Sequence, residues 1–368
     1  MITLKRLTNS QAYLPFIDGL RFFAIIPVIL VHFVDFYERN TRKIQDADHY
    51  GNLLTGDSNN AVLLFFVISG FVLGLPFARH YFSGSAAPDL KSFFTRRLTR
   101  LEPPYLLVLT GLMLMNVFVF HKSGLTEQLP HYFASFFYLH NIIYQEYPTI
   151  NFVFWSLEIE VQFYLLAPLL AKVFSLATNK RRITLVCSIL FFGIMNYYYR
   201  TPFIFLLNFI QYFLAGFLAL DLYLNNPFKK GYMFDAGAIL LLIIIWTGIS
   251  KYGLILPFVL GGFIYFSSLS LLFFKFISSG WVSIMGGMCY SIYMLHYPVM
   301  AAFLNRVVGN SLVTESPAMD IQIKFGLSVI VIFGVSALFF ILIERPCMKK
   351  DWYKHFFRRL KLTENKPV

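Results

Sequence analysis

The sequence predicts an all-α protein, a polytopic membrane helical bundle of about ten transmembrane helices with both termini in the cytoplasm. Of its 368 residues, 57% are hydrophobic and 14% are charged, whereas soluble domains average about 45–50% and about 25%. The mean hydropathy of +0.63 agrees with this. These values exclude intrinsic disorder and a disulfide scaffold, and they favour one membrane domain over two soluble ones.

Each predicted helix is a run of about 20 mostly apolar residues, the length that crosses a bilayer. Residues 130–145 are aromatic but too polar for an easy span, so we predict an interfacial or re-entrant segment there. Residues 1–346 form the predicted membrane domain. Residues 347–368 form a basic tail, in which DWYKHFFRRLKL fits an amphipathic surface helix. The ten predicted spans are 14–37, 59–78, 101–120, 153–176, 182–199, 202–222, 233–250, 254–274, 281–304 and 321–344.

The basic residues set the predicted orientation. With the N-terminus inside, 22 of the 31 Lys and Arg lie on cytoplasmic segments, eight lie on outer segments, and Arg21 lies within a span. The net charge of +12 is therefore mostly a positive-inside bias that meets anionic membrane lipid, and it argues against nucleic acid as a partner. The three cysteines are too few for a disulfide framework and have no metal spacing, so we expect no metal.

The first span holds two ionisable residues, which are costly inside a membrane and usually mark a site. Arg21 and His32 are eleven residues apart, so both project from one helix face, about 16 Å apart along the axis. The plain alternative is a snorkelling arginine together with a histidine that is hydrogen-bonded to a neighbouring helix. Because the two share a face, we favour a functional role.

The fourth span begins WSLEIEVQFYLLAPLL and brings two carboxylates into the membrane from the outer side. Glu160 and His32 are predicted at overlapping depths, where a carboxylate can fix the tautomer of an imidazole. A structural contact without chemistry is the alternative. Glu158 has the further alternative of facing lipid headgroups.

The cytoplasmic start of the third span reads KSFFTRRLTRLEPPY. Arg96, Arg97 and Arg100 crowd it, and we expect Pro103 and Pro104 to perturb its first turn. Clustered arginines suit phosphate, because the guanidinium fork binds it in a bidentate manner. Such a cluster is more often a positive-inside anchor.

Three further segments carry polar groups. FFVISGF places Ser69 at mid-membrane, GGMCYSIYMLHYPV carries Tyr293 and His296, and the tenth span ends in Glu-Arg-Pro at 344–346. Their plain alternatives are close helix packing, a satisfied buried histidine, and a helix stop with a local salt bridge. The sequence has no nucleotide phosphate loop, His-Glu-x-x-His or Gly-x-Ser-x-Gly, so ATP-driven pumping, zinc proteolysis and serine-hydrolase chemistry have no support.

Taken in order, these segments resemble the acyltransferase-3 family of integral membrane acyltransferases. The matching stretches lie between residues 18 and 346: DGLRFFAIIPVILVHF, FFVISGF, RRLTRLEPPY, WSLEIEVQFYL, CYSIYMLHYP and ERP. Each stretch is weak alone, but six in order make the resemblance specific. Cys289 stands where the family commonly has Ser. We also expect no appended extracytoplasmic hydrolase-like domain, which some members carry.

The resemblance implies transfer of an acyl group, usually acetyl from cytoplasmic acetyl-CoA, to a hydroxyl of a carbohydrate such as O-antigen or exopolysaccharide. It implies a multi-pass protein of the cytoplasmic (inner) membrane. His32 would be the catalytic base or acyl relay, Arg21 its partner, and Glu160 the group that orients His32 or the acceptor. The residues assigned to the donor are Arg96, Arg97, Arg100, Ser69 and Arg345. Those assigned to the acceptor are His296, Tyr293 and Glu158.

Two other classes of protein stay open. A transporter or flippase of a glycan or small anion also suits buried Arg, His and Glu, although the sequence shows no inverted repeat. Consumption of acetyl-CoA would separate it from the enzyme. A scaffold for polysaccharide assembly would not need charges inside the membrane. The acceptor, the acyl length, the oligomeric state and the choice between a covalent acyl-histidine and direct transfer are not readable from the sequence.

Overall fold

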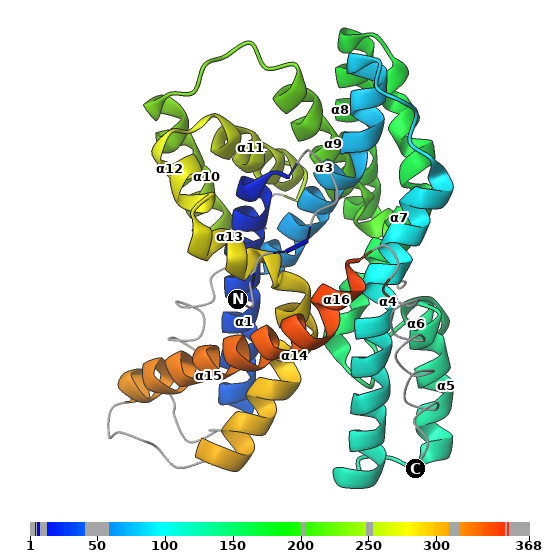
Figure 1. Ribbon diagram of the computed structural model, residues 1–368, viewed down its shortest axis with the longest axis vertical. Coiled ribbons are helices and arrows are strands. Elements are labelled where there is room, and N and C mark those ends of the chain that lie inside the picture. Colours follow the sequence, from blue (N-terminus) through cyan, green and yellow to red (C-terminus); the bar gives the residue numbers. More distant parts are fainter. Residues whose placement is uncertain are drawn as a thin grey trace, which may run out of the picture.

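The computed structural model describes residues 13–40, 59–199, 204–247, 253–308 and 317–349, together with Leu4, Arg6, Leu7 and Trp352. These residues are largely helical and contain no strand, which confirms the predicted all-α bundle (Figure 1). The α-helices are α1 (Pro15–Asn40), α3 (Asn59–Ser83), α4 (Leu90–Leu114), α5 (Leu125–Phe136), α6 (His140–Tyr144), α7 (Trp155–Leu170), α8 (Thr178–Tyr198), α9 (Ile210–Leu224), α10 (Tyr232–Thr247), α11 (Leu256–Leu269), α12 (Leu272–Ile277), α13 (Gly280–Gly287), α14 (Cys289–Phe303), α15 (Pro317–Phe339) and α16 (Arg345–Cys347).

Short turns of other helix types extend several of these helices. π-helical turns follow α4, α14 and α15 at Met115–Val119, Leu304–Val308 and Phe340–Glu344. 3₁₀ turns flank α7 at Phe152–Phe154 and Ala171–Ser175, and another precedes α9 at Leu206–Asn208.

Each of the ten predicted ranges contains helix. Three helices that are shorter than a bilayer-crossing segment, α9, α10 and α11, are apolar as well. The number of crossings and their orientation stay predictions. The segments long and apolar enough to cross a membrane are Pro15–Arg39, Asn60–Ser83, Leu90–Val119, Phe152–Ser175 and Met319–Cys347.

The start of α4 differs from the prediction. The helix begins eleven residues earlier than the predicted span, at Leu90, where the Asp89 carboxylate accepts a hydrogen bond from the Ser92 N–H at 3.0 Å. The arginines therefore lie within a continuous helix and not in a loop before it. An arginine on a helix has a fixed direction, which a loop arginine does not.

The two prolines of α4 also lie inside the helix. Pro103 and Pro104 do not break it, although Pro103 offers no N–H to the Thr99 carbonyl one turn earlier. That carbonyl accepts a hydrogen bond from the indole of Trp352 instead, at 3.0 Å. The predicted tail helix over 351–362 otherwise lies outside the described residues.

The segment predicted not to span forms two short helices, α5 and α6. The 12 residues of α5 cover about 18 Å, which is too short for a bilayer. Tyr138 turns the chain between them with a φ of 58°, and its ring stacks on Tyr105 of α4 at 4.8 Å between centroids. The Tyr105 hydroxyl donates to the Ser135 carbonyl at 2.8 Å, so α5 is anchored to α4.

Helix α1 lies at the centre and packs against α3, α13 and α14. Figure 1 shows that α1 and α4 run in the same direction, so their first turns lie toward one end of the molecule. The contact between α13 and α1 requires glycine, because a Cβ at Gly286 would lie 1.6 Å from the Asp18 carbonyl oxygen. This close approach fixes the first turn of α1, where the polar groups begin.

Candidate active site

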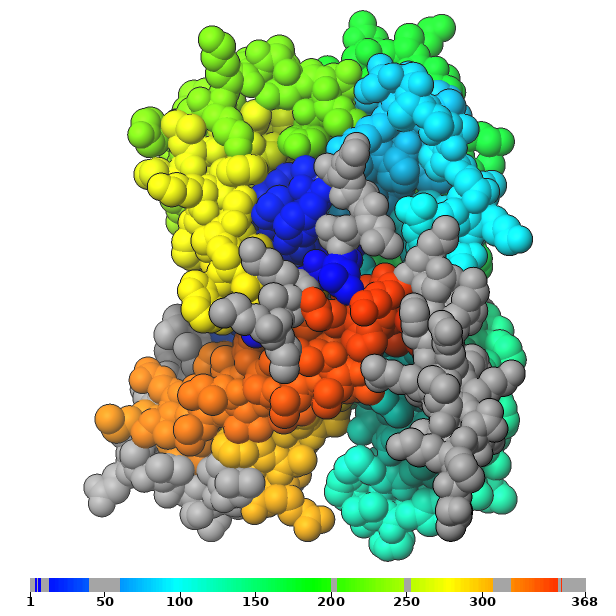
Figure 2. Space-filling view, viewed as in Figure 1, coloured from blue at the N-terminus to red at the C-terminus, as the bar shows by residue number. Residues whose placement is uncertain are grey.

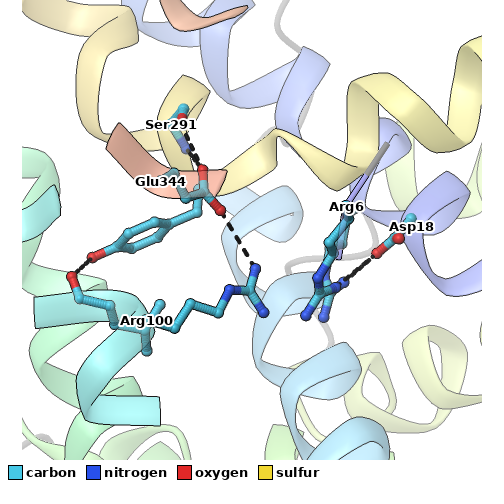
Figure 3. Close-up of polar contacts among 8 residues, drawn as sticks. Arg6, Asp18, Arg100, Ser291 and Glu344 are labelled. Atoms are coloured by element: carbon cyan, nitrogen blue, oxygen red, sulfur yellow. Dashed lines mark hydrogen bonds and ion pairs between the residues drawn. The ribbon is translucent and has the colours of Figure 1, made fainter. Parts of the chain in front are cut away.

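Five charged groups from distant parts of the chain gather at the start of α1. Asp18 and Arg21, one turn apart, form an ion pair, and Arg6 donates to the same Asp18 oxygen, Oδ1, at 3.1 Å. Arg100 of α4 reaches the Glu344 carboxylate at 3.5 Å. Figure 3 shows the side chains of Arg6 and Arg100 pointing toward one another. We call Arg6, Arg21 and Arg100 the guanidinium cluster.

Glu344 is held by the π-helical turn that ends α15. It is fully buried, and it accepts hydrogen bonds from the Ser291 N–H at 3.2 Å and from the Ser291 hydroxyl at 2.5 Å. The space-filling view shows this end of α15 lying against the N-terminal residues (Figure 2). Arg345 follows as the half-buried first residue of α16. Single π turns within helices are frequent at functional sites.

The other two arginines of α4 take different directions. Arg97 donates to the Phe93 carbonyl at 2.8 Å and stacks over the Phe93 ring at 3.6 Å, close enough to Arg100 for their charges to interact. Arg96 is exposed and donates to the Ser92 hydroxyl at 2.9 Å. The structure therefore brings Arg97 and Arg100 inward and leaves Arg96 on the surface.

His32 meets a second imidazole, His296 of α14. The rings stack with centroids 5.2 Å apart, and Phe152 closes one side of His32 at 5.0 Å. Nδ1 of His296 lies 2.7 Å from the Tyr293 carbonyl, which can only accept, so Nδ1 carries the hydrogen. Nε2 of His296 and Nδ1 of His32 are buried without a hydrogen-bond partner among the described residues. We call His32 and His296 the histidine pair.

Glu160 lies on the arginine side and not on His32. Its carboxylate accepts a hydrogen bond from the Ser69 hydroxyl at 2.5 Å, and it is close enough to Arg21 and Arg97 for their charges to interact. No hydrogen bond joins it to His32 in the described part of the chain. The predicted carboxylate–imidazole pair is therefore replaced by a pair of imidazoles.

The remaining two predicted residues position the start of α7. The Tyr293 hydroxyl donates to the Val153 carbonyl. Glu158 is fully buried and accepts the Asn141 N–H at 2.9 Å, so it joins α6 to α7 and does not face headgroups. Because Phe152 immediately precedes Val153, these contacts fix the wall beside His32.

The site contains residues that sequence reasoning did not assign to it. The sequence did contain a signal for Asp18, because this residue precedes Arg21 by three positions and so lies on the same helix face. The sequence contained no such signal for Arg6, which lies outside every motif and contributed only to the bias of basic residues toward the cytoplasmic side. Ser291 lies in the segment GGMCYSIYMLHYPV, but its contact with Glu344 depends on tertiary packing.

The guanidinium cluster and the histidine pair lie at two depths along α1. Eleven residues separate Arg21 from His32, which corresponds to about 16 Å. One group can hold a multiply charged anion, and the other can accept a proton or an acyl group. A ligand that occupies both must be elongated and carry its charge at one end.

The chain resembles known acyltransferases over most of its length. A family model described as an acyltransferase domain matches residues 14–345. A peptidoglycan O-acetyltransferase, OatA, of Listeria monocytogenes is 31% identical over an alignment of 182 residues, gaps included, which covers 46% of this chain and 26% of that protein. An O-acetyltransferase OatA of Staphylococcus aureus is 28% identical over an alignment of 348 residues, gaps included, which covers 82% of this chain and 53% of that protein. The match thus spans at most about half the length of these relatives. No solved structure matches the chain.

Proposed function

This chain belongs to the acyltransferase-3 family, and on that premise we propose that it is a membrane O-acetyltransferase. It moves an acetyl group from cytoplasmic acetyl-CoA to a hydroxyl of a cell-surface or exported glycan, and it resides in the cytoplasmic (inner) membrane. The Listeria relative is named for peptidoglycan, so this glycan is the first acceptor to test, beside O-antigen and exopolysaccharide.

One observation carries the proposal: a single helix, α1, contributes to both polar groups. Arg21 lies in the guanidinium cluster, and His32 lies in the histidine pair. Coenzyme A is elongated, with phosphates at one end and a thioester at the other. Arginine suits the phosphates, and an imidazole suits the proton transfer near the thioester.

The proposed reaction needs little from the protein beyond orientation and proton transfer, because a thioester already has a good leaving group. The acceptor hydroxyl oxygen attacks the carbonyl carbon, the C–S bond breaks, and coenzyme A leaves as a thiolate that takes up a proton. His32 accepts the hydroxyl proton, or it first takes the acetyl group and passes it to the hydroxyl. Both routes use its imidazole, whose Nδ1 is unpartnered among the described residues.

The test is the glycan mass in cells that produce His32→Ala. We expect the wild type to add about 42 Da, one acetyl group, per modified unit, and the variant to add none, because proton transfer contributes about 10²- to 10⁴-fold. Membrane abundance of both proteins is measured first. Normal acetylation by an equally abundant variant would contradict the assignment. Unmodified glycans in both strains, with no acetyl-CoA consumed, would favour a transporter.

A further inference from the structure

Contacts with α13 and α1 determine the position of Arg6. Its Cβ lies 3.7 Å from where a Cβ of Gly287 would stand, so Arg6 lies against α13. Its guanidinium group shares Asp18 Oδ1 with Arg21. The side chains of Arg6 and Arg21 are only 17% and 18% exposed. Two largely buried cations thus converge on one carboxylate oxygen.

Arg100 approaches Arg6 and Arg21 from the opposite side, and the positive charges of these guanidinium groups repel one another. The charges of Arg6 and Arg100 are close enough to interact (Figure 3). Burial lowers the pKa of Arg6 to about 9, and the nearby guanidinium group of Arg100 is the second cause. The group remains protonated at neutral pH, yet its surroundings favour the charged form less than water does.

The carboxylates nearby do not balance these cations. Arg97 and Glu160 also interact with the charges of Arg100 and Arg21, so four guanidinium groups face three carboxylates, which leaves one positive charge. Glu344 also accepts a hydrogen bond from the Ser291 hydroxyl, and its contact with Arg100 is long at 3.5 Å. Nε of Arg100 is buried and has no hydrogen-bond partner among the described residues. A buried donor without an acceptor costs free energy, and an anion between the side chains would remove that cost.

We propose that Arg6 binds a phosphate group of the acyl donor together with Arg21 and Arg100. The inference rests on the proposed donor, acetyl-CoA. Asp18 and Glu344 hold the three guanidinium groups in place, so their N–H groups are already oriented when the phosphate arrives. Phosphate accepts several charge-assisted hydrogen bonds, which is the chemistry that a cluster of arginines offers. The alternative is that Arg6 only ties the N-terminal residues to α1.

The first measurement is coenzyme A binding to the full chain in phosphatidylcholine nanodiscs, by isothermal titration calorimetry. Arg6→Ala should weaken binding about 10- to 100-fold, the range for loss of a charge-assisted hydrogen bond. Arg6→Lys should fall between, because it keeps the charge and loses the fork. Lys91→Ala is the matched control, since it removes an exposed cation near the start of α4. Unchanged binding in Arg6→Ala overturns the proposal.

The second measurement separates phosphate binding from a structural role. Acetyl-pantetheine carries the thioester without any phosphate. We expect Arg6→Ala to raise the KM for acetyl-CoA and to leave transfer from acetyl-pantetheine at the wild-type rate, which also shows that the variant folds. Equal losses with both donors would mean that Arg6 only stabilises the fold, and the proposal would be wrong.

Two further arms identify the source of the phosphate. Discs containing phosphatidylglycerol test a lipid headgroup: if Arg6→Ala changes only the response to this lipid, the phosphate is not that of the donor. Titration with pyrophosphate tests the anion site without the donor. A wild type that binds pyrophosphate through Arg6, but neither binds coenzyme A nor transfers acetyl, contradicts the proposed function and leaves the anion site standing.

Discussion

A single hydrogen bond decides which atom of the histidine pair is available to a ligand. The Tyr293 carbonyl holds the hydrogen of His296 on Nδ1, so Nε2 is a lone-pair acceptor in a fully buried ring. A buried acceptor without a donor is costly, and a substrate hydroxyl is the natural donor at this place. In the proposed reaction, His296 therefore binds the acceptor hydroxyl while the stacked His32 takes its proton.

Substitution of His296 should therefore affect the acceptor and not the donor. We expect His296→Ala to lower kcat/KM for the glycan about 10- to 100-fold, with coenzyme A affinity unchanged, because one hydrogen bond to the hydroxyl is lost. His296→Gln should retain more activity, since its amide oxygen can replace Nε2. His80→Ala is the matched control, because His80 contacts the Ser85 carbonyl in a region outside the site. A parallel loss of coenzyme A binding would count against this division of roles.

At the scale of the helices, the sequence predicted where helices form better than which groups their side chains meet. Apolar runs marked all ten helical ranges, because length and hydropathy are local properties. The sequence predicted that Glu160 and His32 lie at overlapping depths, whereas the Glu160 carboxylate accepts a hydrogen bond from Ser69 and interacts with the charge of Arg21. Partners such as Arg6 depend on tertiary packing that periodicity does not contain. Pro103 lies inside α4, and the Thr99 carbonyl, which Pro103 leaves without a backbone donor, accepts a hydrogen bond from the indole of Trp352.

The packing of α3 on α9 gives a direct test of helix spacing. A Cβ at Gly216 would lie 2.2 Å from the Val67 carbonyl oxygen, so Gly216→Ala must push the two helices apart. We expect it to lower the free energy of unfolding by about 1–3 kcal/mol or more, the usual cost of overpacking. Thermal unfolding in detergent measures this.

The control for the packing test is Gly334→Ala on α15. A Cβ there meets nothing within 4 Å, and alanine has the higher helix propensity. Its midpoint should stay at or slightly above that of the wild type. If both alanine variants unfold at the wild-type temperature, the close contact of α3 and α9 does not exist in the folded protein.

At the scale of the whole molecule, the proposed reaction requires that its two polar groups serve different sides. The guanidinium cluster lies at the first turn of α1, and the histidine pair lies about 16 Å further along the same helix. The bias of basic residues predicts that the first of these ends is cytoplasmic. Coenzyme A is made inside the cell and glycans are exposed outside, so the direction of α1 decides whether the donor can reach its arginines.

Cysteine labelling tests that direction. In a Cys187→Ser background, which removes the exposed native thiol, an added cysteine is placed at one of two exposed positions. A membrane-impermeant maleimide should label Thr126→Cys, at the start of α5, in intact cells. It should label Ser85→Cys, between α3 and α4, only after permeabilisation, because that loop adjoins the arginines of α4. The reverse pattern would put the guanidinium cluster outside the cell, where acetyl-CoA is absent, and the proposed donor would be wrong even if the glycan carries acetyl groups.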